Sequence, residues 1–168
     1  GFPGVRWMKM TDPSGTEAPS NVGSFLIWQQ PHFIYLAELV YRSNPSDEVI
    51  QKYNKLVQET AEFMYAFATY DEFHGRFILK GAIPAQETLR AATTINPPFE
   101  LSYWHFAMQT AQKWRERAGG KRNLEWDEMI DKLRLLITRI ISTWHPKMPL
   151  ILTKIFVLPA ITWPCSVP

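Results

Sequence analysis

Glu87 is the carboxylate whose position best fits a reactive group, because the residues around it predict an irregular loop between two helices. The loop runs over residues 81–97, has an amide, Gln86, next to the glutamate, and ends at a helix start, Asn96-Pro97. Helical enzymes keep reactive groups in such loops, because the flanking helices hold the loop in place. Glu87 is therefore a candidate acid, although a solvent-exposed loop glutamate without a role has the same pattern.

A carboxyl group in such a loop is one half of what hydrolysis of a glycosidic bond requires. One carboxylic acid gives a proton to the leaving oxygen, and a second carboxylate activates water or attacks the sugar. In inverting enzymes the two groups lie about 6.5–9.5 Å apart, which leaves room for the water. Glu87 suits the acid role, and we expect it to be the catalytic residue of this chain.

The composition is that of a folded domain rich in aromatic residues. Of the 168 residues 46% are hydrophobic, and seven are tryptophans. Tryptophan stacks on the C–H face of sugars, so this number is typical of carbohydrate sites and equally of helices packed with bulky side chains. Residues 134–168 carry four basic and no acidic side chains, whereas the rest of the chain carries 14 basic and 16 acidic ones. This body lacks a basic patch, so we expect no nucleic-acid partner.

Turn signals and apolar spacing predict a helical body over residues 1–133. Residues 1–24 are expected to form an extended loop, and residues 76–79 a short strand. Four helices are expected, of which the first covers residues 31–41 and the last residues 123–133. The second follows the start signal Ser43-Asn44-Pro45 and keeps apolar residues as far as Phe67. The third is capped by Asn96, has Pro97 in its first turn and ends at Gly119-Gly120. The helix that follows Pro97 is expected to have one apolar face, formed by Phe99, Tyr103, Phe106, Ala107, Thr110, Ala111 and Trp114. The predicted fold class is all-α, with helical hairpins and long loops at one end.

The tail, residues 134–168, departs from this pattern. It has no acidic residue and no glycine, holds five prolines, and its Ile and Leu runs lose helical phase. Two interpretations stay open, a buried extended arm and a frameshift. A one-base shift in a possible coding sequence turns ITRII, at residues 137–141, into the polar run YNKNN. We hypothesise that the chain is frameshifted from about Arg134 onward, which the encoding DNA would test.

Signals for a compartment are few. The single cysteine, Cys165, allows no internal disulfide. No charged segment precedes an apolar run near Gly1, so no signal peptide is in view. The longest apolar run, residues 149–161, is interrupted by Lys154 and Pro159, so we expect no membrane span.

The sequence predicts no metal and no cofactor. His32, His74 and His105 have no spacing with Cys, Asp or Glu that specifies a metal site, and we interpret them as packing or surface residues. The chain has no glycine-rich phosphate loop and no G-x-S-x-G turn.

Three segments resemble the six-hairpin glycosidases: RWMKM at residues 6–10, LIWQQPHFIYLAEL at residues 26–39, and IPAQE…NPPFELSYW at residues 83–104. The resemblance covers roughly residues 1–133 and implies a glycoside hydrolase catalytic domain folded as an (α/α)6 toroid, of which this chain supplies a part. The related maltose and kojibiose phosphorylase group has its general acid in a Gly-Pro-Asp-Glu loop, which Pro84 and Glu87 match. Gln86 replaces the acidic residue of that loop, so phosphorolysis is in doubt.

The resemblance also implies the substrate-binding residues, which we expect to be Arg6, Trp7, Lys9, Trp28, Gln29, Gln30, Gln86, Glu100 and Trp104. Simpler interpretations stay open for some of them. Arg6 and Lys9 also fit a solvated loop, Trp28 fits core packing, and Glu100 fits a first-turn acid favoured by the helix dipole.

The expected function is that of a glycoside hydrolase fragment that acts on an oligosaccharide or glycoside in carbohydrate metabolism. A full toroid has more helices than this chain supplies, so the catalytic base is expected from a later hairpin and the fragment is expected to be inactive alone. The alternatives are a non-catalytic helical module that binds glycans or protein helices, and a disaccharide phosphorylase. A periplasmic or secreted parent protein fits the hydrolase, and the sequence does not indicate an oligomeric state.

Overall fold

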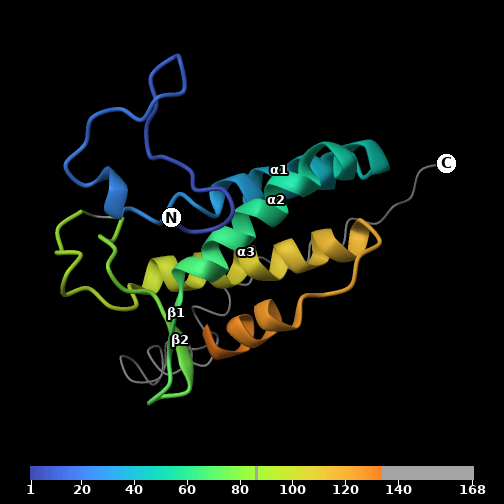
Figure 1. Ribbon diagram of the computed structural model, residues 1–168. Helices are drawn as coiled ribbons and strands as arrows, with labels where there is room; N and C mark the ends of the chain where they lie inside the picture. The colour runs from blue at the N-terminus through green and yellow to red at the C-terminus, as the bar shows by residue number, and fades with distance from the viewer. Residues whose placement is uncertain (86, 134–168) are drawn as a thin grey trace, which may run out of the picture.

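The computed structural model describes residues 1–85 and 87–133, and within these residues the chain is mostly helical (Figure 1). Its elements in chain order are η1 (Gly23–Phe25), α1 (His32–Ser43), α2 (Asp47–Phe67), β1 (Thr69–Asp71), β2 (Arg76–Ile78), α3 (Pro98–Arg117) and a helix over residues 124–133. The helical class is confirmed. Gln86 and the tail, with its proposed frameshift, lie outside the described residues.

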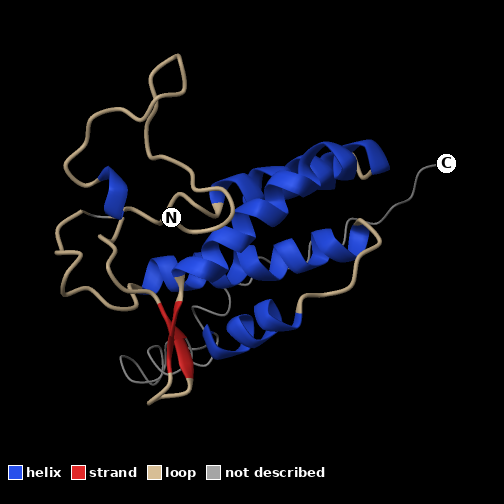
Figure 2. Ribbon diagram, viewed as in Figure 1, coloured by secondary structure: helices blue, strands red, loops and turns tan. Residues whose placement is uncertain are grey.

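The helices pack against one another, and the long loops gather at one end (Figure 2). Helix α2 contacts both α1 and α3, and α1 also contacts α3. In Figure 1 the loops of residues 1–30 and 80–97 lie together on the left, where α1 and α3 begin. None of the helices in the described part has the length and apolar character needed to cross a membrane.

Three tryptophans form the centre of the hydrophobic core. Trp104 and Trp114 are fully buried, and Trp126 is 2% exposed. They pack with apolar side chains of all the longer helices, among them Ile34, Met64, Met108 and Met129. Most of the tryptophans in the described residues are therefore used for packing, as the simpler interpretation of the composition predicted.

Helix α2 is capped by Ser46, two residues after Asn44 of the predicted start signal. Ser46 Oγ accepts a hydrogen bond from Val49 N at 3.4 Å, and Asp47 and Glu48 occupy the first turn. The predicted cap at Ser43-Asn44 is wrong, because α1 continues to Ser43 and Pro45 precedes the cap. Proline disfavours helical geometry in the residue before it, so α1 ends there and the next serine becomes the cap.

The predicted cap of α3 is also wrong. The helix begins at Pro98 after Pro97, and Asn96 makes no capping bond. Asn96 has a φ of 55°, its Oδ1 accepts from Leu79 N at 2.8 Å, and its own N donates to Leu79 O at 2.7 Å. Asparagine tolerates this left-handed conformation, so its side chain satisfies the end of the preceding strand instead of the helix.

The predicted apolar face of α3 is correct only in its second half. Ala107, Thr110, Ala111 and Trp114 are buried as expected. In the first half the buried side chains are Glu100, Leu101 and Trp104, whereas Phe99 is 47% exposed and Tyr103 and Phe106 are half-buried. Helix α3 packs against both α1 and α2, so its buried surface is broader than one stripe, and the first aromatic residues stay at the surface.

A short hairpin follows α2. Strand β1 pairs antiparallel with β2, with Tyr70 opposite Phe77. The sequence predicted β2, and missed β1 because three residues are too few to show an alternating pattern.

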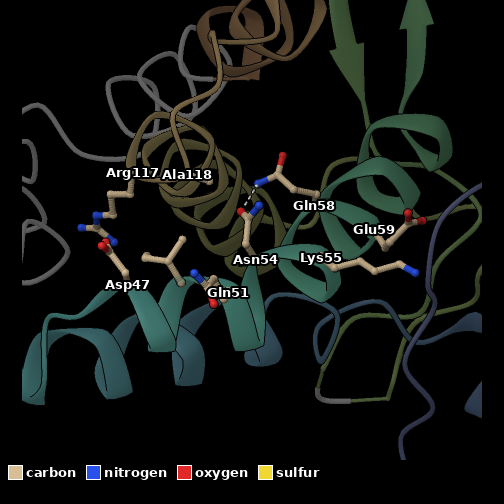
Figure 3. A pocket seen from close by; sticks show the side chains of 9 residues that line it. Asp47, Gln51, Asn54, Lys55, Gln58, Glu59, Arg117 and Ala118 are labelled. Atoms are coloured by element: carbon tan, nitrogen blue, oxygen red, sulfur yellow. Dashed lines mark hydrogen bonds between the residues drawn. The ribbon is translucent and has the colours of Figure 1, made fainter.

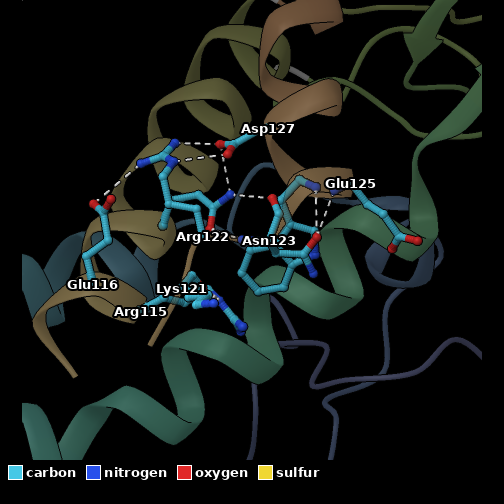
Figure 4. Close-up of polar contacts among 9 residues, drawn as sticks. Arg115, Glu116, Lys121, Arg122, Asn123, Glu125 and Asp127 are labelled. Carbon is cyan, nitrogen blue, oxygen red and sulfur yellow. Dashed lines mark hydrogen bonds and ion pairs between the residues drawn. The ribbon is translucent and has the colours of Figure 1, made fainter. Parts of the chain in front are cut away.

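Polar side chains fix the turn between α3 and the helix over residues 124–133 (Figure 4). Asn123 caps this helix, since its Oδ1 accepts the N–H groups of residues 125 and 126 at 2.9 and 3.2 Å. Gln112 in α3 binds both the N–H and the C=O of Asn123, at 3.0 and 2.6 Å. Arg122 Nε donates to Asp127 Oδ2 at 3.0 Å. The predicted helix start near Asn123 is confirmed.

One carboxylate is buried between α1 and α3. Glu38, 2% exposed, accepts hydrogen bonds from Trp114 Nε1 at 2.9 Å, Arg42 Nε at 2.9 Å and Arg117 Nη1 at 2.6 Å. Burial raises the pKa of Glu38, but the hydrogen bonds from the two arginines and Trp114 outweigh it, so the pKa lies below its ordinary value.

Glu38→Gln should lower the free energy of unfolding by about 3 kcal/mol at pH 7, because it leaves the Arg117 guanidinium beside a neutral buried partner. Since the folded-state pKa is lowered, this contribution is fully present above the ordinary pKa of 4.5 and is lost as the pH falls through the folded value. Urea denaturation between pH 7 and pH 3 measures both effects, with exposed Glu72→Gln as control. A difference that stays constant down to pH 3 would contradict the ion-pair account.

Candidate functional site

Segments that are far apart in the sequence meet at the loop end of the helices. Ile83 N donates to Phe25 O at 2.9 Å, and Leu26 and Ile83 form a parallel bridge. Trp104 Nε1 in α3 donates to Ile27 O at 3.1 Å. The segments that the sequence singled out around residues 26–30, 83–87 and 100–104 are therefore in contact.

The loop that carries Glu87 is closed at its base. Asn96 binds both backbone groups of Leu79, and Lys80 pairs with Ile95 in an antiparallel bridge. The two ends of the loop over residues 80–95 are thus adjacent, which is the arrangement of a compact surface loop. Such closure limits how far Glu87 can move relative to the helices.

Glu87 itself has a strained backbone. Its φ is 58°, and within the described residues only Asn96 shares a positive φ among non-glycine residues. A left-handed conformation costs an ordinary residue about 1–2 kcal/mol. Glu87 N donates to Pro84 O at 2.8 Å, which helps to hold this geometry. Strain that the surroundings maintain is concentrated at functional sites.

Lys9 reaches the Glu87 side chain from the N-terminal segment. Its ammonium forms an ion pair with Glu87 Oε1, and both side chains are partly exposed. Lys9, expected as a substrate-binding residue, therefore lies beside the candidate acid. Because Lys9 occupies Oε1, a leaving oxygen has to approach Oε2 or displace the ammonium.

Trp7 is half-buried, and its side chain is bonded within the protein. Its Nε1 donates to Thr60 Oγ1 at 2.9 Å, and its ring stacks on Phe33 with centroids 5.0 Å apart. The Gln30 side chain binds both the N–H and the C=O of Trp7, each at 2.7 Å. Gln29 Nε2 adds a bond to Trp7 O at 3.1 Å. Gln29 and Gln30 are 6% and 0% exposed, so they position residues 6–9.

Arg6 and Gly4 fasten the same segment to its neighbours. Arg6 Nη2 donates to Gly23 O at 3.1 Å, which links the segment to η1. Gly4 has a φ of 79°, and a Cβ there would lie 2.3 Å from Glu59 O in α2. Only glycine allows this approach, so the chain enters the site directly along α2.

Glu100 and Trp104 support the site from below. Glu100 is 1% exposed, and its Oε1 accepts from Ala85 N at 2.8 Å, two residues before Glu87. Burial raises the pKa of Glu100, against the opposing effect of its bonds to the backbone N–H groups of Glu100 and Ala85. Trp104 is fully buried. Glu100 therefore positions the Glu87 loop, and Trp104 positions the neighbouring segment at Ile27. Neither side chain is at the surface, where the expected contact with substrate would be made.

Trp28 lies at the edge of the site, with neighbours that the sequence interpretation missed. It packs edge-to-face on His32, with centroids 5.2 Å apart, and Tyr103 Oη lies 2.9 Å from His32 Nδ1. His32 was interpreted only as a packing or surface residue. The available signal was the spacing: His32 follows Trp28 by four residues, Tyr103 follows Phe99 by four, and both pairs lie where helices begin.

Two hollows of the described surface have linings that do not include Glu87. One of about 610 Å³ is lined by polar residues of α2, with Arg117 and Ala118 at the end of α3 (Figure 3). Another, of about 320 Å³, lies between the end of α1 and the start of α2. Neither contains a predicted site residue, so we base the site on the geometry around Glu87. In the described residues no group of three His, Cys, Asp or Glu side chains is placed to hold a metal ion.

Comparison with known proteins does not assign the chain to a family. No family model matches it, and no curated protein matches it. The geometry around Glu87 is therefore the basis for a function.

Glu100→Gln should become more stable relative to wild type as the pH rises. Between the ordinary pKa of 4.5 and the raised folded-state pKa, the folded protein keeps a proton that the unfolded chain has released, so wild-type stability falls across this window. The glutamine variant lacks this loss. Denaturation at pH 4 and pH 7 measures the difference, with Glu125→Gln, an exposed first-turn glutamate, as control. A variant that gains nothing between the two pH values would contradict the assignment.

Proposed function

We propose that this chain is part of the catalytic domain of a glycoside hydrolase, with Glu87 as the general acid. The observation that carries the proposal is the Glu87 loop: a strained, carboxylate-bearing residue lies in a loop fixed at the end where α1 and α3 begin. The loop backbone is held from η1 through Ile83 and from α3 through Ala85, and the Glu87 side chain is held by Lys9. A carboxyl group held in place and partly exposed is what proton donation to a bound substrate requires.

The proposed chemistry divides between Glu87 and residues that position it. The protonated form of Glu87 gives its proton to the glycosidic oxygen as the bond between the sugar carbon and that oxygen breaks, and the carboxylate that remains pairs with the Lys9 ammonium. Glu100 fixes the loop through Ala85. Gln29 and Gln30 hold the segment from which Lys9 projects.

A second carboxylate is needed on the opposite face of the sugar, and we assign it to another hairpin of the domain. Glu100 is unsuited to that role, because its carboxylate is 1% exposed and directed at the backbone of the Glu87 loop. Water cannot be activated at a carboxylate that water does not reach. The (α/α)6 toroid is part of this proposal, supported by the antiparallel succession of helices, in which α1 and α3 begin at the same loop end.

A non-catalytic glycan-binding module is the second candidate. It is favoured by one observation: the Glu87 side chain is 33% exposed and lies outside the described hollows. Such a module would use the same aromatic side chains and would not need the acid.

Glu87→Gln tests the proposal in the protein that contains this domain, assayed on α- and β-linked aryl glycosides. Turnover should fall about 10²- to 10⁴-fold, the usual contribution of a general acid. Glu128→Gln is the matched control, because it removes another exposed Lys–Glu pair, with Lys132, away from the loop. A loss of only a few-fold in Glu87→Gln would contradict the acid role. Turnover by the 168-residue chain alone would contradict the assignment of the second carboxylate.

A further inference from the structure

Four aromatic side chains form a continuous surface where α1 and α3 begin. The ring centroids of Trp28 and His32 are 5.2 Å apart, those of His32 and Tyr103 5.4 Å, and those of Phe99 and Tyr103 5.8 Å. Phe99 and His32 are exposed, and Trp28 and Tyr103 are half-buried. We call these four residues the aromatic surface.

The aromatic surface is anchored to the frame that holds Glu87. Phe99 precedes Glu100, whose carboxylate binds Ala85 N in the Glu87 loop. Trp28 follows Ile27, whose carbonyl accepts the indole N–H of Trp104. A ligand on this surface is therefore held by the same first turns of α3 that position the candidate acid.

The aromatic surface also carries polar groups. Burial, together with Tyr35, raises the pKa of Tyr103 to about 12, so its hydroxyl keeps its proton. Burial lowers the pKa of His32, so its ring is neutral at pH 7. When the Tyr103 hydroxyl donates to His32 Nδ1, the ring proton is on Nε2 and can be donated to a ligand. Trp28 Nε1 is buried and has no hydrogen-bond acceptor among the described residues.

We propose that the aromatic surface binds a pyranose ring, as a subsite at the loop end of the helices that also carries Glu87. A sugar offers both things that this surface needs, a C–H face to pack on the rings and oxygen atoms to accept from His32 Nε2. An apolar helix from another chain would cover the rings and leave that donor unpaired, whereas the buried Trp28 N–H is out of reach of either ligand. The subsite rests on the proposed function for its substrate class, and its binding step does not depend on catalysis.

The test is binding of maltose and cellobiose to the purified 168-residue chain, measured by saturation-transfer NMR and tryptophan fluorescence. Trp28→Ala should weaken binding about tenfold through lost ring contact, and Tyr103→Phe, which keeps the ring, about threefold through the lost hydroxyl. Phe73→Ala is the matched control, because Phe73 is a 91% exposed aromatic residue in the turn between β1 and β2, and it should leave binding unchanged. Circular dichroism checks that each variant is folded.

Binding of neither disaccharide, or wild-type binding by both Trp28→Ala and Tyr103→Phe, would overturn the subsite. So would a change in oligomeric state of Trp28→Ala without a change in sugar affinity, which indicates a protein partner. These failures are distinct from failure of the proposed function. If the subsite fails and Glu87→Gln still abolishes turnover, the hydrolase stands, whereas sugar binding without an effect of Glu87→Gln supports the subsite within a binding module.

Discussion

The first turns of α3 are the point on which the candidate site depends. Glu100 accepts a hydrogen bond from Ala85 N, and Trp104 gives its indole N–H to Ile27 O. Through these two hydrogen bonds, the loops at Ala85 and Ile27, which are distant in sequence, are attached to one helix. Both side chains are almost fully buried. Burying a carboxyl group without a cationic partner is unfavourable. The buried Glu100 carboxyl offsets this cost by holding the Glu87 loop in one position.

The residues expected to contact substrate mostly support the site instead. Trp7, Gln29 and Gln30 bind one another, and their polar groups are largely used within the protein. The side chains left at the surface beside the loop are Glu87 with Lys9, and the aromatic surface of Trp28, His32, Phe99 and Tyr103. In the proposed hydrolase, proton donation and binding of the sugar would fall to different side chains, and the inner layer of polar contacts would hold both groups in place.

Local signals predicted the elements, and long-range contacts decided their details. The apolar spacing of α2 and the start near Asn123 could be found from sequence because a helix repeats every few residues. The cap at Asn96 could not, because its partner is Leu79, 17 residues away. The Lys9–Glu87 pair joins residues 78 positions apart, which no local pattern reports. Apolar periodicity also does not determine which side of α3 packs against α1. Phe99 was therefore predicted on the buried face, whereas it is exposed.

The central claim is that α3 holds the Glu87 loop in place, and amide hydrogen exchange at Ala85 tests it most directly. The bond to Glu100 predicts that this amide exchanges slowly although Ala85 is at the surface. In Glu100→Ala the Ala85 amide should exchange much faster, while amides in the middle of α3 keep their protection. An Ala85 amide that exchanges as fast as an unstructured chain in the wild type, or equally slowly in the variant, would contradict the account.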